Sequence, residues 1–189
     1  MAAMAGASLW ARQSVPAPRA TVTVCIESDP HVPMGTRGWA SEMFASIGVR
    51  IDWHEWNSCP AGAISVHLFY APLNRQTPKN LGFAESHEGT RIVVFLDRVE
   101  NLNPTRGPRV LAHVLVHEIT HILEGTGRHS ATGIMKARWD REDYFAMLRK
   151  DLPFAQEDIE MIYDGLGKRQ ARVATAGKSA VSAAAVAGH

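Results

Sequence analysis

HEITHILEGTGRHSATGIM, residues 117–135, contains two histidines four residues apart, with a glutamate directly after the first. On a helix, residues with this spacing lie on one face about one turn apart, so His117 and His121 can direct two imidazole nitrogens at a single zinc ion. Glu118 lies beside the first histidine, where its carboxylate can reach a water on the ion instead of the ion itself. The motif predicts a catalytic zinc site in which Glu118 acts as general base and then general acid.

His129, just beyond the motif, is a candidate third zinc ligand, and it is favoured over its neighbours because imidazole is the commonest protein ligand for metals such as zinc. Gly125 and Gly127 can both take positive φ, so the segment GTGR can loop out and return this side chain to the ion. Glu124 is disfavoured, since it lies close to the end of the expected helix. His113 extends the histidine stripe, but three such residues span about 12 Å at about 1.5 Å per residue, too far to share one ion. We expect His113 to be a hydrogen-bonded histidine of the core, or one that orients a metal ligand without touching the metal.

Beyond the spacing of its histidines, the segment resembles the metzincin clan of zinc metallopeptidases. That clan carries H-E-x-x-H-x-x-G-x-x-H, followed by a methionine in a tight turn under the metal, the Met-turn. The resemblance maps onto the motif His117, Glu118 and His121, onto its third histidine His129, and onto the Met-turn Met135. It implies a zinc-dependent endopeptidase with one catalytic ion, and it makes Met135 an apolar floor under the metal site.

The chain departs from the clan pattern around its third ligand. Gly125 falls one residue later than the glycine of the pattern, and His129 falls two residues later than its third histidine. Ala137 stands where some members of the clan keep a tyrosine after the Met-turn. Some zincins use a downstream glutamate as the third zinc ligand, so Glu142 and Asp143 are alternatives to His129. The asparagine–glutamate pattern typical of those zincins is missing around them.

Strand-like and helix-like segments alternate along the chain, as judged by the spacing of apolar side chains. Strands are expected at 21–28, 49–56, 63–71 and 91–99, with a helix at 36–48 between the first two. The long apolar helix at 109–124 carries the zinc motif, and further helices are expected at 140–150 and 153–168. These segments predict an α+β fold with a small sheet and one helix first, then the active-site helix and a helical C-terminal part. The resemblance implies that this fold is of the zincin or metzincin type, with a small mixed sheet packed on a helix and the active-site helix.

The expected domain organisation follows from where large apolar side chains are found. Residues 21–169 are predicted to form one domain, since 189 residues suffice for one substantial core. Residues 1–20 are expected to be flexible, and residues 170–189 to be a disordered tail, because Ala, Gly and Ser bury too little to offset the entropy of ordering. The N-terminal apolar run lacks a preceding basic residue and is a poor signal peptide. A start site placed too far downstream would leave export open, so no compartment is assigned.

Charge and cysteine content narrow the classes of partner. With 20 Lys and Arg against 19 Asp and Glu, the charge of the chain gives no indication that it binds nucleic acid or an anionic membrane. No apolar run is long enough to span a bilayer. We expect a monomer that acts on a peptide or protein. Cys25 and Cys59 form no C-x-x-C pair, which argues against a thiolate zinc site. A disulfide and two buried thiols are both open.

Substrate binding is assigned, by the same resemblance, to an edge strand that pairs with an extended peptide. The candidate is LGFAES at 81–86, where Gly82 and Ala84 leave the backbone approachable on either side of Phe83. An ordinary loop fits the same residues equally well. A second function is a non-catalytic, zinc-stabilised binding module, although structural zinc usually has four protein ligands and does not need Glu118. A third is hydrolysis of a non-peptide amide.

Overall fold

The computed structural model describes residues 17–26, 32–70, 80–86, 89–102 and 107–186, with side chains as far as Arg172. Five strands form one mixed sheet in the order β2-β1-β3-β5-β4. Four of them run parallel: β1 (Ala20–Ile26), β2 (Val49–Glu55), β3 (Ile64–Phe69) and β5 (Arg91–Phe95). β4 (Gly82–Ala84) pairs antiparallel with β5 at one edge. The predicted α+β fold with a small mixed sheet is confirmed.

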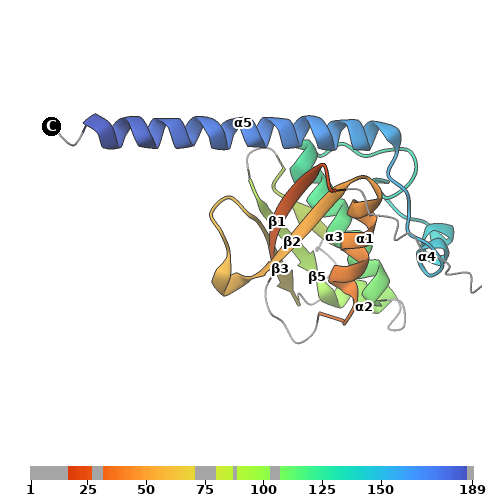
Figure 1. Ribbon diagram of the computed structural model, residues 1–189. Coiled ribbons are helices and arrows are strands. Elements are labelled where there is room, and N and C mark those ends of the chain that lie inside the picture. The colour runs from red at the N-terminus through yellow and green to blue at the C-terminus, as the bar shows by residue number, and fades with distance from the viewer. Residues whose placement is uncertain (1–16, 27–31, 71–79, 87–88, 103–106, 187–189) are drawn as a thin grey trace, which may run out of the picture.

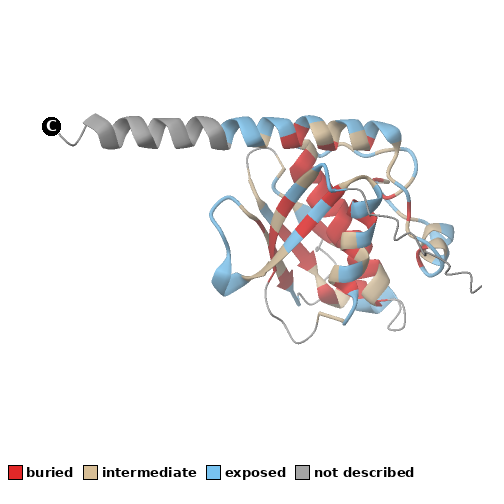
Figure 2. Cartoon of the chain, viewed as in Figure 1, coloured by how far each residue is buried: buried red, intermediate tan, exposed pale blue. Residues whose placement is uncertain are grey.

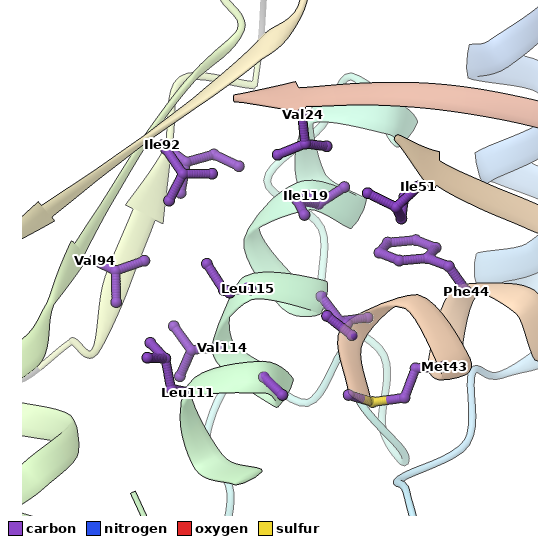
Figure 3. Close-up of a cluster of buried hydrophobic side chains, with 14 of the residues drawn as sticks. Val24, Met43, Phe44, Ile51, Ile92, Val94, Leu111, Val114, Leu115 and Ile119 are labelled. Carbon is purple, nitrogen blue, oxygen red and sulfur yellow. The ribbon is translucent and has the colours of Figure 1, made fainter. Parts of the chain in front are cut away.

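Two helices, α1 (Thr36–Ser46) and α3 (Gly107–Glu124), cover one face of the sheet (Figure 1). Side chains alternate across each strand, so one set from every strand points at these helices. In the core, Val24 and Ile51 from the strands face Phe44 of α1 and Ile119 of α3 (Figure 3). The hydrophobic core therefore lies between the sheet and the helix that carries the zinc motif.

The motif helix α3 is the most enclosed element of the fold. Every residue from Val110 to Leu123 is buried, as the red band along this helix shows (Figure 2). A helix that is apolar nearly all round needs neighbours on every side, and α3 receives them from the sheet, from α1 and from α5 (Gln156–Val186). It ends where the sequence predicts, at Gly125, whose φ is 69° and whose N–H bonds the His121 carbonyl at 3.0 Å.

The predicted strand at 91–99 is wrong in its second half. β5 ends at Phe95, and α2 (Leu96–Leu102) begins directly after it. Three successive residues from Ile92 are buried, as in an interior parallel strand, whereas Leu96 and Val99 are buried at helical spacing. A continuous apolar run does not distinguish these two periods, and this run contains both.

Both helices predicted after the zinc motif are present, with shifted bounds. α4 (Arg141–Met147) begins after Asp140, whose side chain accepts hydrogen bonds from the first turn, as expected for a cap. α5 begins at Gln156 instead of residue 153, because the carbonyl of Pro153 accepts a hydrogen bond from the Ile134 N–H at 2.9 Å. The segment before α5 therefore pairs with the chain that follows the motif helix.

The last helix carries the chain beyond the domain that the sequence predicts. α5 continues as a helix to Val186 and extends beyond the body of the molecule (Figure 1), through much of the segment predicted to be a disordered tail. Residues 1–16 lie outside the described residues. The division into a domain at 21–169 and two flexible ends stays a prediction. No described helix is both long and apolar enough to cross a membrane.

A disulfide links the sheet to the segment after β2. Cys25 of β1 bonds to Cys59, which follows the short 3-10 helix η1 (Trp56–Ser58), with a Cα–Cα distance of 5.7 Å. Of the two options that the sequence leaves open, a disulfide and two separate thiols, the structure has the disulfide.

Candidate metal centre

Three histidines from two segments meet at the C-terminal end of α3. One ring nitrogen from each of His117, His121 and His129 lies within 4.8 Å of the others. The first two come from one face of α3 and are buried, while His129 comes from the loop after the helix and is exposed. The group therefore has an enclosed side and a side open to solvent, as a site that admits both a metal ion and a substrate needs.

Backbone carbonyls hold the two buried rings in one orientation. His117 Nδ1 lies 2.9 Å from the Ile134 carbonyl oxygen, and His121 Nδ1 lies 3.0 Å from that of Thr126. A carbonyl only accepts, so each Nδ1 carries the proton and each Nε2 presents a lone pair. Burial lowers the pKa of both rings to about 4, which keeps them neutral at pH 7.

The two Nε2 atoms of these rings face each other at 3.1 Å. With both protons on Nδ1, no hydrogen bond can form between them, and two lone pairs at this distance repel. A metal ion bound by both nitrogens would remove the repulsion. Two nitrogens bound tetrahedrally to one zinc at about 2.0–2.1 Å would be about 3.4 Å apart, so the donor set of His117 and His121 fits zinc in both chemistry and separation.

His129 closes the group from the open side. Its ring centroid lies 5.3 Å from that of His117 and 4.9 Å from that of His121. Partial desolvation of the exposed ring, and then the positive charge of Arg128, lower the pKa of His129 below its usual value, which favours the neutral form that binds metal. Despite its late position in the sequence, the predicted third ligand lies beside the other two.

Glu118 follows the first histidine on α3, and its side chain lies beside the edge strand of the sheet. The side chain is buried, and an added Cβ at Gly82 of β4 would stand 3.2 Å from its Oε1 atom. Burial raises the pKa of Glu118 to about 8. A carboxyl group in this setting can exchange a proton near neutral pH, as a general base that later acts as an acid must.

The turn at residues 133–135 contacts the first histidine of the cluster through the Ile134 carbonyl. Gly133 has φ of 75°, and a Cβ there would overlap the carbonyl oxygen of Pro153. Met135 is fully buried, and its carbonyl accepts a hydrogen bond from Ser130 N–H at 2.8 Å. This turn places the Ile134 carbonyl against His117. The assignment of Met135 as a Met-turn floor stays a prediction.

The alternative carboxylate ligands lie outside the histidine group. Asp143 closes a capping box with Asp140 and pairs with Lys136 at 2.5 Å, and Glu142 is exposed on the same first turn of α4. Glu124 pairs with Arg128 at 3.9 Å. None of these carboxylates belongs to the histidine group.

Sequence reasoning missed the groups that hold the histidines in place. The backbone carbonyls of Thr126 and Ile134 cannot be identified from the sequence, since every residue has such a group. Trp139 donates from Nε1 to the Ile134 carbonyl at 3.2 Å, and its ring lies 5.6 Å from that of His117. A single aromatic residue after the turn does not stand out from ordinary core residues.

A cavity of about 730 Å³ lies apart from the histidine cluster. Glu124, Thr90 and Arg169 are among its lining residues, whereas none of the three histidines or Glu118 lines it. The donor set, and not this cavity, therefore marks the candidate site.

The fold is metzincin-like, with a mixed sheet, an antiparallel edge strand and a central helix that carries two of the three histidines. Its solved neighbours include the archaemetzincin from Methanopyrus kandleri, with a TM-score of 0.54 and 16% sequence identity over 78% of this chain and 96% of that one. The archaemetzincin from Archaeoglobus fulgidus, complexed with malonate, gives a TM-score of 0.45 and 16% identity over 75% of this chain and 99% of that one. The likeness in fold therefore stands on the structure from Methanopyrus kandleri. No protein-family model and no curated protein matches the sequence.

Proposed function

We propose that the protein is a zinc-dependent endopeptidase with His117, His121 and His129 as metal ligands and Glu118 as general base and acid. The observation that carries this proposal is the pair of Nε2 atoms at 3.1 Å, each with its proton fixed on the far side of its ring. The likeness in fold to an archaemetzincin supports the same function. When bound, zinc supplies Lewis acidity, which makes water easier to deprotonate and polarises a carbonyl group.

Glu118 handles the protons of the reaction. Its carboxylate takes a proton from the attacking water and passes it to the leaving amine, so that it ends in its starting state. Its buried position beside β4 keeps solvent away from the proton and raises its pKa to about 8. In the absence of metal a carboxyl group with this pKa is mostly protonated at pH 7, and a nearby zinc ion would favour the carboxylate that the first transfer needs.

The outer edge of β4 offers backbone groups to an extended peptide. Phe95 N–H donates to the Leu81 carbonyl at 2.8 Å, and Glu85 N–H donates to the Arg91 carbonyl at 2.9 Å. Since backbone groups alternate along a strand, the N–H and C=O groups of Gly82 and Ala84 point away from β5. We expect a peptide that pairs with these backbone groups to pass beside Glu118. The backbone hydrogen bonds would then hold its scissile bond close to the Glu118 carboxylate.

The test compares wild type with Glu118→Gln, which keeps the size of the side chain and removes its basicity. We expect wild type to hold one zinc per chain and to cleave members of a mixed peptide library. Glu118→Gln should retain the zinc and lose at least about 100-fold in cleavage rate. Mass spectrometry of the products and elemental analysis of the protein provide the two measurements.

Glu142→Gln is the matched control, because it makes the same chemical change at an exposed position. It should keep both zinc and activity. Loss of zinc from this variant would move the third ligand to Glu142. A wild-type protein that holds one zinc but cleaves no peptide would favour the zinc-stabilised binding module instead.

A further inference from the structure

One buried carboxylate holds both neighbours of His129. Asp158, in the first turn of α5, is fully buried. Its Oδ1 accepts from Arg128 Nη2 at 2.7 Å and from the hydroxyl of Ser130, while its Oδ2 accepts from Ala155 N–H at 3.0 Å. The loop that carries the third histidine is thereby fastened to the start of the last helix.

The fastening also sets the direction of the histidine between the two anchored residues. The side chains of Arg128 and Ser130 both reach Asp158, whereas the ring of His129 lies within 5.3 Å of the other two histidine rings. Along these three residues the side-chain contacts therefore alternate between Asp158 and the histidine cluster. With its two neighbours held on one side, His129 is directed to the other, toward the cluster.

Arg128 is fixed by more than its pair with Asp158. Its Nη1 lies 3.3 Å from Ser130 Oγ and 3.4 Å from Glu157, and its Nε lies 3.2 Å from the sulfur of Met161. Each of these contacts restricts the guanidinium, so it acts as a rigid link between the loop and α5. The loop needs such a link, because Gly125 and Gly127 allow its backbone many conformations.

We propose that Asp158 is a positioning residue that holds His129, through Arg128 and Ser130, in the place from which it completes the metal site. This inference rests on the proposed zinc peptidase and adds to it the group that compensates for the long spacing between His121 and His129. Groups that orient a metal ligand without touching the metal commonly contribute about 10- to 100-fold to metal affinity.

The experiment measures the zinc dissociation constant of metal-free proteins by competition with a chromophoric chelator. Asp158→Asn preserves shape but removes the charge that pairs with Arg128, and it should weaken zinc binding by about 10- to 100-fold. Asp164→Asn is the matched control, since Asp164 lies on the same helix, is exposed and pairs only with Lys168 among the ion pairs described. Its zinc affinity should stay within about twofold of wild type.

A second comparison separates positioning of His129 from a general effect on the fold. In a His129→Ala background, Asp158→Asn should cause no further loss of zinc affinity, because the ligand that it positions is gone. A purely structural role would weaken binding in both backgrounds. With cobalt(II) in place of zinc, the visible absorption of Asp158→Asn should move from the wild-type spectrum toward that of His129→Ala.

Unchanged zinc affinity in a folded Asp158→Asn protein, or an equal loss in both backgrounds, would overturn the inference. If that variant does not fold, Arg128→Met makes the same test from the other side of the ion pair, with the same expected loss and the same dependence on His129. Zinc binding that depends on Asp158 in a wild-type protein that cleaves no peptide would refute the proposed peptidase alone. A wild-type protein that binds no zinc would refute both.

Discussion

His113 shows what one buried imidazole can hold together at the scale of a single residue. Leu152 N–H donates to its Nε2 at 3.2 Å, so this nitrogen carries a lone pair. Its Nδ1 lies 2.7 Å from the Arg109 carbonyl oxygen and therefore carries the proton. The neutral ring joins α3 to the segment before α5, which agrees with its predicted role as a core histidine and not a ligand.

The neutral state of His113 makes stability depend on pH. Burial lowers the pKa of His113 below 6.5, and this effect outweighs the Arg109 carbonyl and Asp151, which act in the opposite direction. Below pH 6.5 the unfolded chain binds a proton at this position that the folded chain does not bind, so the free energy of unfolding falls as pH decreases. His113→Gln should be less stable by about 1–3 kcal/mol at pH 8. The difference should shrink toward pH 5, in urea unfolding with chelator present.

A parallel pair of stability curves for the wild type and His113→Gln from pH 8 to pH 5 would contradict this account. The other buried histidines titrate in the same direction in both proteins, so only the difference between the curves reports on His113. The chelator is needed because zinc would otherwise link the remaining histidines to pH as well.

Gly82 is the residue where a single methyl group should affect catalysis. An added Cβ would lie 2.9 Å from the Val93 carbonyl oxygen and 3.2 Å from Glu118 Oε1, both closer than normal contacts. Gly82→Ala should therefore displace β4 or the Glu118 carboxylate and lower kcat/KM for peptide cleavage by about 10- to 100-fold. Zinc content should remain at one per chain.

Gly38→Ala is the control for this substitution. A Cβ at Gly38, on the exposed side of α1, meets nothing within 4 Å. This variant should keep full activity and gain about 0.5 kcal/mol of stability, because alanine favours the helix. If both variants had the same activity, the close approach of β4 to Glu118 would have no part in catalysis.

The parts of the site that lie within one helix could be predicted from the sequence, whereas the parts brought together by a loop or by a distant helix could not be derived from the local sequence alone. The spacing of His117 and His121 predicts a shared face, because every helix has the same period. Whether His129 returns to them depends on loop conformation, which the two glycines permit but do not fix. The anchor in α5, Asp158, is a distant acid in the sequence, and nothing local connects it with the loop.

At the scale of elements, the contact between α3 and α5 depends on one small residue. A Cβ on Gly165 of α5 would overlap the carbonyl oxygen of Leu123 near the end of α3. Gly165→Ala should force the two helices apart and cost about 1–3 kcal/mol of stability or more. Chemical denaturation monitored by circular dichroism measures this loss.

Gly167→Ala provides the matched comparison two residues further along α5. A Cβ there meets nothing within 4 Å and the position is exposed, so the variant should gain up to about 1 kcal/mol. The opposite signs of the two substitutions would distinguish tight helix packing from helix propensity. Equal gains would mean that α5 does not lie this close to α3.

The elements themselves follow from periodicity where it is unambiguous. The strands predicted at 21–28 and 49–56 correspond to β1 and β2, although residues 27 and 28 lie outside the described residues. The run at 91–99 changes period at Leu96 without any glycine or proline to mark the boundary, so sequence alone merges β5 with α2. The start of α5 is set by the pairing of Pro153 with Ile134, a tertiary contact that local propensity does not contain.

At the scale of the whole molecule, the disulfide restricts the unfolded chain. Cys25 and Cys59 are separated by 34 residues, and closing a loop of this length stabilises the fold by about 3–4 kcal/mol in the chain-entropy description. The double variant Cys25→Ala/Cys59→Ala should lose about this amount in urea unfolding. A reductant should destabilise the wild type similarly and leave the double variant unchanged. A wild type that ignores the reductant would contradict a stabilising role for the disulfide.

Zinc should stabilise the whole molecule, because the three proposed ligands lie on the buried helix α3 and on the loop whose Arg128 and Ser130 hydrogen-bond Asp158 of α5. An ion that binds only the folded state at about 100 times its dissociation constant contributes about 2.7 kcal/mol. For a chain of this size, that corresponds to a rise in Tm of about 5–10 °C. Adding zinc to metal-free protein in a thermal scan should produce this rise, and a chelator should reverse it.

The dependence of that rise on single histidines tests the ligand set as a whole. His129→Ala leaves two ligands on α3, so its Tm should respond much less to zinc at the same concentration. His54→Ala removes a histidine of β2 that pairs with Asp52 at 3.1 Å and lies outside the cluster, so its response should equal that of wild type. Equal responses in all three proteins would place the third ligand elsewhere. A reduced response confined to His129→Ala would show that the ion links the loop to the core, since two histidines on one helix cannot join separate segments.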